Sequence, residues 1–201
     1  MELVRTRLSK MMISVGAAAS YATPTRPTFD ALYEMHFKFV WRCLRRLGVR
    51  SAYLDDACQD VFLIVHKKLD TYEPRTSPLA WLFAIARRVA HDYRRRESRK
   101  GGGLPLHNQH PSPDADPHQA AVQGQSVDII LEFLDTLPEY QREAFILSEL
   151  EQLSAPEVAA AVSANVSTIY SRIHTARQGL ARFVRRNYPD MATSSEGDRG
   201  A

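Results

Sequence analysis

Apolar residues recur every three or four positions through most of this chain, and no segment shows the alternation of a half-buried strand. A spacing of three or four places apolar side chains on one face of a helix. Such stripes occupy residues 29–47, 54–69, 79–93, 127–137, 139–150 and 154–162. The pattern therefore predicts an all-α fold whose helices pack through these faces.

The composition changes abruptly between residues 101 and 125, where four glycines and four prolines accompany almost no large apolar residue. A stretch of this kind cannot bury enough apolar surface to form a core, and it is typical of a flexible linker. We therefore expect two small helical domains, at residues 28–100 and 126–188. The ends of the chain, residues 1–27 and 189–201, are expected to be a disordered extension and a disordered tail.

Composition also limits the class of protein. Hydrophobic residues make up 44% of the chain, and no apolar run approaches the roughly 20 residues needed to cross a bilayer, so no membrane insertion is expected. Cys43 and Cys58 match no zinc-ligand spacing and are expected to be buried thiols in a reduced, cytoplasmic protein. The sequence lacks the common catalytic and phosphate-binding motifs, so we expect no enzymatic activity, no metal site and no cofactor.

Positive charge gathers in two helical segments although the net charge is only +3. Residues 87–100 hold seven lysines and arginines against two acids, and residues 172–186 hold five arginines and no acid. Either run alone fits a solvated helix face as well as a polyanionic partner.

Two helix starts lie close together in "LSAPEVAAAVSANVSTIYSRIHTARQGLARFV". Ser154 and Glu157 form a capping box, and Pro156 is tolerated in the first turn because no backbone N–H is needed there. The letters "SANV" predict a turn, after which Ser167 is expected to cap a second helix. Two helices in this arrangement predict a helix-turn-helix, which places its second helix in the major groove of DNA. A helical hairpin within an ordinary bundle is the alternative.

The second helix of this unit offers a polar face. We expect Ser167, Tyr170, Ser171, His174 and Thr175 near base edges. Arg172 and Arg177 are expected to meet phosphates or bases.

Three stretches, in this order and across a linker, resemble the extracytoplasmic-function (ECF) subgroup of bacterial sigma factors. "DDACQDVFLIVHKKL" resembles the polymerase-binding helix of that family, and "SPLAWLFAIARRVAHDYRRR" resembles its promoter-melting helix. "LPEYQREAFILSELEQLSAPEVAAAVSANVSTIYSRIHTARQGL" resembles its C-terminal promoter-reading domain. The resemblance implies a promoter-specificity subunit without a catalytic site of its own. A stand-alone helix-turn-helix regulator is the alternative, and it would leave the first two stretches unexplained.

The resemblance also implies roles for particular residues. Core-polymerase binding falls on an acidic, polar helix start that also complements the helix dipole: Asp55, Asp56, Gln59 and Asp60. Recognition and melting of the minus-ten element fall on the loop at 71–78 and the helix after it: Tyr72, Trp81, Arg87, Arg88, His91, Arg94 and Arg95. Family members often carry asparagine at the position of Arg88, so base readout there does not transfer.

The partners implied by the resemblance are core RNA polymerase, promoter DNA and an anti-sigma factor. The resemblance assigns recognition of the minus-thirty-five element to the helix-turn-helix. The promoter sequence stays open, because Ser167, Tyr170 and Thr175 stand where the family commonly has glycine or basic residues.

Overall fold

The computed structural model describes residues 27–73, 77–99 and 117–189, with side chains in the last range from residue 126 onward. All regular structure in these ranges is helical, which confirms the all-α prediction. The predicted disordered extension, linker and tail fall largely on residues 1–26, 100–116 and 190–201, outside the described part of the chain.

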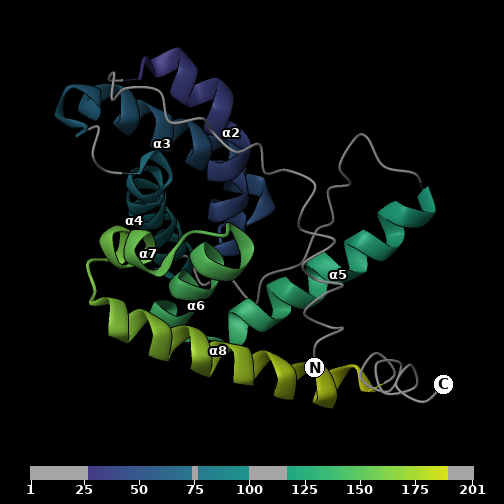
Figure 1. The fold of residues 1–201 in the computed structure, drawn as a ribbon. Coiled ribbons are helices and arrows are strands. Elements are labelled where there is room, and N and C mark those ends of the chain that lie inside the picture. The colour runs from purple at the N-terminus through teal and green to yellow at the C-terminus, as the bar shows by residue number, and fades with distance from the viewer. Residues whose placement is uncertain (1–26, 74–76, 100–116, 190–201) are drawn as a thin grey trace.

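Three helices form the N-terminal domain: α2 (Phe29–Arg46), α3 (Leu54–Lys68) and α4 (Pro78–Arg99). Short 3₁₀ turns at Ser51–Tyr53 and Leu69–Thr71 flank α3. Each helix contacts the other two, as Figure 1 shows in its upper part. The predicted stripes meet in this bundle, where Val40, Val61 and Phe83 are completely buried.

Both ends of α2 have a local physical cause. Thr28 precedes the helix, and its hydroxyl oxygen accepts a hydrogen bond from the Ala31 N–H at 3.3 Å. At the other end Gly48 takes a left-handed φ of +89°. The Gly48 and Val49 N–H groups then donate to the carbonyls of Arg45 and Leu44, the pattern of a Schellman motif.

The C-terminal domain comprises α5 (Pro117–Thr136), α6 (Glu139–Phe145), a π-helical turn (Ile146–Leu150), α7 (Ala155–Val162) and α8 (Val166–Asn187). Figure 1 shows α8 along the lower edge, with α6 and α7 above it. The prediction was wrong at the start of this domain, because α5 begins at Pro117, inside the predicted linker. Alanine and glutamine are good helix formers, and proline is tolerated at a first helical position, so this helix needs no apolar stripe to begin.

Helices α7 and α8 form the predicted helix-turn-helix pair. The Ser154 N–H and hydroxyl both donate to the Glu157 carboxylate, at 2.9 Å and 2.6 Å, which confirms the capping box. The predicted cap of α8 was wrong: the helix begins at Val166, Asn165 occupies the cap position, and Ser167 lies within the first turn. Starting there, α8 turns Ile169, Ile173 and Ala176 into the core.

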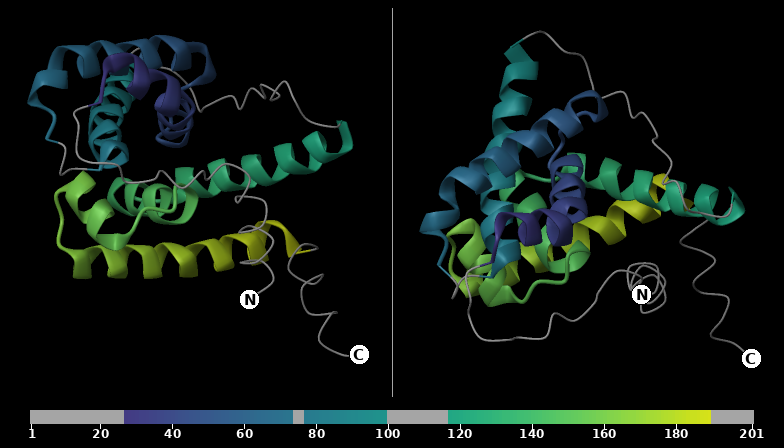
Figure 2. Two further views of the ribbon diagram at one scale, coloured as in Figure 1. Left: turned by 45° about the horizontal axis from the view of Figure 1, so that its top comes forward. Right: turned by 90° about the horizontal axis from the view of Figure 1, so that it is seen from above.

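The two domains lie against one another. Their buried apolar residues form one continuous cluster, and α4 contacts α7 directly. Figure 2 shows the α2–α4 bundle resting on the helices of the C-terminal domain. Within the described ranges, no helix combines the length and hydropathy required of a transmembrane span.

Candidate nucleic-acid interface

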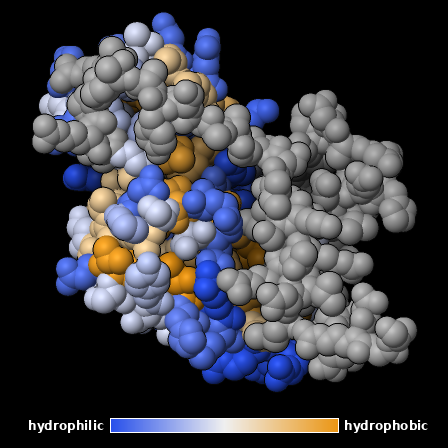
Figure 3. All heavy atoms as spheres, viewed as in Figure 1, coloured by the Kyte–Doolittle hydropathy of each residue, from blue (hydrophilic) through white to orange (hydrophobic). Residues whose placement is uncertain are grey.

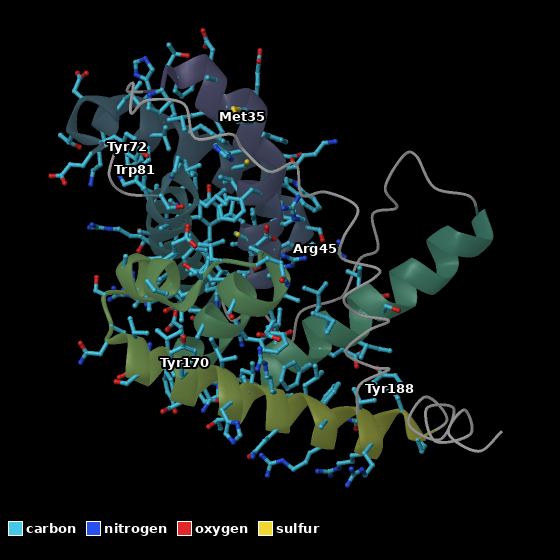
Figure 4. All side chains as sticks on the ribbon, in the orientation of Figure 1. Met35, Arg45, Tyr72, Trp81, Tyr170 and Tyr188 are labelled. Atoms are coloured by element: carbon cyan, nitrogen blue, oxygen red, sulfur yellow. The ribbon has the colours of Figure 1, made fainter. Side chains whose placement is uncertain are left out.

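The outer face of α8 is polar and accessible. All five residues predicted to approach base edges are exposed on it: Ser167, Tyr170, Ser171, His174 and Thr175. Tyr170 retains 63% of its accessible surface, which leaves an aromatic ring in solvent at the start of the helix. Figure 4 labels this side chain on α8, and Figure 3 shows hydrophilic side chains gathered along the lower edge, where α8 runs in Figure 1. The arrangement fits a recognition helix.

The two arginines predicted on α8 are placed differently from these five residues. The Arg172 guanidinium lies 5.3 Å from the centre of the Tyr140 ring, and its side chain is half-buried. Arg177 is exposed and pairs with Glu149 at 2.7 Å. At about 100° per residue, Arg172 and Arg177 fall on opposite flanks of the polar face rather than at its centre.

The basic residues of α4 that were predicted to contact the minus-ten element divide into two groups. Arg88, His91 and Arg95 are exposed. Arg87 and Arg94 instead face carboxylates of the C-terminal domain, with Arg87 at 3.4 Å from Glu143 and Arg94 at 3.7 Å from Glu139. Burial raises the pKa of the Glu143 carboxyl, while the nearby Arg87 opposes that shift.

A groove of about 630 Å³ runs between the two domains. Its charged and aromatic walls come from α4, α6 and α8: Arg87, Arg88, His91, Glu139, Tyr140, Glu143 and Arg172. The structure thus gathers three residues predicted for the minus-ten element with one predicted for the minus-thirty-five element. These residues lie far apart in the sequence, so the sequence alone did not predict that they would line one groove.

Tyr72, which follows the 3₁₀ turn Leu69–Thr71, and Trp81, in the first turns of α4, form an aromatic pair. Their ring centroids are 4.9 Å apart, and Figure 4 shows the two side chains next to one another. Tyr72 is only 3% exposed, whereas Trp81 is half-buried. Of the two rings, Trp81 therefore has the accessible surface with which to stack on a base.

The start of α3 carries the predicted polymerase-facing residues. Asp55, Asp56 and Gln59 are exposed, whereas Asp60 is half-buried and accepts a hydrogen bond from the Tyr93 hydroxyl at 2.9 Å. One turn beyond Gln59 the same face exposes Leu63, which retains 51% of its accessible surface. Sequence reasoning missed Leu63, although an apolar residue on an otherwise polar helical stripe was a visible signal.

The described residues contain no group of three or more histidine, cysteine, aspartate or glutamate side chains suited to a metal ion. Both cysteines are buried free thiols, as the sequence predicted. Burial raises the pKa of the Cys58 thiol to about 12 and shifts that of Cys43 in the same direction.

Comparison with known proteins identifies this arrangement. Residues 32–100 match the model for sigma-70 region 2, and residues 128–180 match that for sigma-70 region 4, together more than half of the chain. The ECF RNA polymerase sigma factor SigD of Mycobacterium tuberculosis is 37% identical over 146 residues, which cover 69% of this chain and 68% of that protein. The chain belongs to the ECF sigma factors.

Two further relatives extend the match. SigE of Mycolicibacterium smegmatis is 29% identical over 171 residues, covering 84% of this sigma factor and 66% of SigE. CnrH of Cupriavidus metallidurans is 27% identical over 175 residues, covering 83% and 92% of the two chains. The family membership makes this chain a sigma subunit that directs RNA polymerase to particular promoters.

Solved structures share the fold. The sigma factor RpoE of Bartonella quintana, in complex with the anti-sigma factor NepR, matches with a TM-score of 0.65 at 23% identity over 79% of this chain and 98% of that one. CnrH in complex with the cytosolic domain of CnrY matches with a TM-score of 0.62 at 21% identity over 91% and 97%. At these identities the likeness establishes the fold of this sigma factor.

Proposed function

We propose that this sigma factor divides promoter recognition between the two basic helices. The outer face of α8 reads the minus-thirty-five element, and α4 binds and opens the minus-ten element. The observation that carries the proposal is that a capped helix-turn-helix exposes the polar face of α8 while α4 exposes Arg88, His91 and Arg95. Exposed cations neutralise phosphates, and the polar face supplies donors and acceptors for base edges.

Trp81 and the start of α4 form the candidate site for an extruded base. Unstacking a base costs a few kcal/mol, which an aromatic platform and nearby cations can offset. Tyr72 packs against Trp81 and, being buried, supports that ring rather than the base.

Core polymerase binds the start of α3 in this proposal. Asp55, Asp56 and Gln59 present an exposed acidic and polar face, which suits a basic partner surface. Leu63 adds exposed apolar area to the same stripe. Asp60 contributes indirectly, because its hydrogen bond to Tyr93 ties α3 to α4.

The further parts of the proposal rest on the relatives. One structural neighbour was solved with the anti-sigma factor NepR and another with the cytosolic domain of CnrY, and we infer that this chain is also held by an anti-sigma factor. We place its action in the cytoplasm, with core polymerase, and assign it no catalytic chemistry of its own.

Reconstituted transcription with core polymerase tests the proposal. We expect Arg88→Ala/Arg95→Ala to lower run-off transcription severalfold on a duplex promoter, because two phosphate contacts are lost. A template already melted across the minus-ten element should restore much of that loss. Lys38→Ala removes an exposed cation from α2 and should leave transcription unchanged.

Two outcomes contradict the proposal. Full activity of the double variant on duplex template would remove α4 from promoter opening. Specific promoter binding by the free chain without polymerase would favour a stand-alone regulator.

A further inference from the structure

The two arginines on the flanks of the α8 polar face are held by different kinds of partner. Arg177 donates to the Glu149 carboxylate, with Nη2 at 2.7 Å from Oε1, so part of its hydrogen-bonding capacity is already used. Arg172 instead lies over an aromatic ring, with its guanidinium carbon 5.3 Å from the centre of Tyr140. The two flanks of one helix therefore present arginines in different states.

A ring partner leaves the hydrogen-bond donors of a guanidinium available. An aromatic face attracts a cation through its electron-rich surface, whereas the N–H donors of arginine lie in the plane of the guanidinium group. A carboxylate occupies the same donors that a phosphate needs. Among the described residues Arg172 forms no ion pair: the charge of Glu143 acts on it, but that carboxylate pairs with Arg87. Tyr140 thus restrains Arg172 without using its donors.

The backbone of Tyr140 is fixed although its ring is not buried. The Pro138 carbonyl accepts hydrogen bonds from the N–H groups of Gln141 and Arg142 at 3.0 and 2.9 Å, which closes the first turn of α6 around Tyr140. Phe145, at the other end of α6, is buried, and α6 packs against α8. The Tyr140 side chain nevertheless retains 50% of its accessible surface. Core packing therefore does not account for an aromatic residue at this position.

The contact has a defined place relative to the DNA-reading face. Tyr140 and Arg172 both belong to the C-terminal domain, so the pair moves with that domain. Arg172 follows the exposed Ser171, and a rotation of about 100° takes it from the polar face to one flank of α8. When a recognition helix enters the major groove, its flanks approach the sugar–phosphate backbone. Arg172 is therefore placed for a phosphate rather than for a base edge.

We propose that Tyr140 is a positioning residue for promoter recognition, which holds Arg172 ready for a backbone phosphate beside the minus-thirty-five element. The proposal rests on the proposed function of α8. A guanidinium that is already restrained loses less conformational freedom when it binds, so the same phosphate contact gives a higher affinity. Helix α8 supplies the cation, and α6 supplies the ring that places it.

Holoenzyme binding to a duplex promoter tests the role of the ring. The promoter is one that the unmodified holoenzyme selects from a library randomised across the minus-thirty-five element. We expect Tyr140→Leu to weaken binding about threefold, because a cation over an exposed ring contributes modestly. Tyr140→Phe keeps the ring and should bind as the unmodified chain does. Unchanged binding by Tyr140→Leu, or an equal loss in Tyr140→Phe, would overturn the proposal.

A double-mutant cycle separates positioning from a merely structural role. Arg172→Ala should weaken binding by more than Tyr140→Leu does, and adding Tyr140→Leu to it should cause no further loss. Circular dichroism checks that each variant keeps its helicity. A further threefold loss in the Arg172→Ala background would mean that Tyr140 acts independently of Arg172, which would overturn the proposal.

Neutral backbone linkages test whether Arg172 contacts a phosphate. Promoter fragments carry one methylphosphonate in place of one phosphate, moved stepwise across the minus-thirty-five element. One such position should weaken binding by the unmodified chain and by Tyr140→Phe but have little effect on Arg172→Ala, which has already lost the contact. A scan in which Arg172→Ala responds at every position as the unmodified chain does would overturn the phosphate contact.

Variants of the exposed face report on the proposed function separately. Unchanged promoter choice by Ser171→Ala/His174→Ala/Thr175→Ala would remove α8 from reading of the minus-thirty-five element. Altered choice by this variant, together with unchanged binding by Tyr140→Leu, would keep α8 as the reading helix and overturn only the role of Tyr140.

Discussion

Helices α4 and α8 are each 22 residues long and basic, yet they differ in how much of their surface the fold buries. Seven residues of α4 are buried, and the C-terminal domain covers part of its cationic surface. Only Ile169, Ile173 and Ala176 of α8 are buried, and its polar face looks outward. Charge density alone therefore does not define a DNA surface. The packing of the neighbouring domain decides which arginines are available.

Truncating a buried side chain of α8 should have the largest effect, because few residues hold this helix in the core. Ile169 is completely buried, and Ile169→Ala leaves a cavity expected to cost about 2–5 kcal/mol of stability. Urea unfolding monitored by circular dichroism measures this cost. Tyr170→Ala, at the adjacent exposed position, should change stability by less than about 0.5 kcal/mol. Equal costs at the two positions would mean that α8 is not anchored through this stripe.

Base readout by α8 can be separated from phosphate binding by α4. His174→Ala removes an exposed donor and acceptor from the polar face, and a base contact is worth about 1–3 kcal/mol of discrimination. We expect relaxed preference at one position of the minus-thirty-five element with an unchanged salt slope. Transcription from a library of minus-thirty-five variants measures the preference. A uniform loss across the library would instead make His174 a phosphate contact.

The capping box that positions α7 against α8 gives a smaller effect. Ser154→Ala should cost about 1 kcal/mol of stability. Hydrogen bonds, chiefly from the Ser154 hydroxyl, lower the pKa of the Glu157 carboxyl. Its stabilising contribution is therefore fully present above the ordinary pKa of 4.5 and is lost as pH falls through the lowered value. Acid titration of the unfolding free energy should show this loss in the parent chain and a weaker one in Ser154→Ala.

A substitution in the turn between α7 and α8 should have the smallest effect, and it should raise stability rather than lower it. Ser163 adopts a left-handed φ of 53°, the conformation that Gly48 supplies at the end of α2. Ser163→Gly relieves that strain but adds chain entropy to the unfolded state, so we expect a gain of at most about 1 kcal/mol. Thermal unfolding measures the change. A loss of stability would show that the serine side chain contributes contacts that outweigh its backbone strain.

Sequence reasoning was strongest where structure is local. The period of the apolar residues located α2, α3 and α4, and Ser154 with Glu157 located the start of α7, because each depends on neighbours within a few positions. It failed at Ser167, since Asn165 is an equally suitable cap residue and the helix begins at Val166. It could not foresee the ion pair of Arg42 with Glu151, which lie 109 residues apart in the chain. Placement of Arg172 in the groove likewise depends on a domain contact that no local pattern encodes.

The π-helical turn at Ile146–Leu150 changes the direction in which the residues after it point. A π turn holds about one residue more than an α turn, and one α-helical residue corresponds to about 100° of rotation. Glu143 precedes this turn and Glu151 follows it, so one added residue sets the angle between the two carboxylates. Deleting a single residue from Ile146–Leu150 would swing Glu151 by about a quarter of a revolution away from Arg42. The spacing of the two acids is therefore as much a part of the domain contact as their charge.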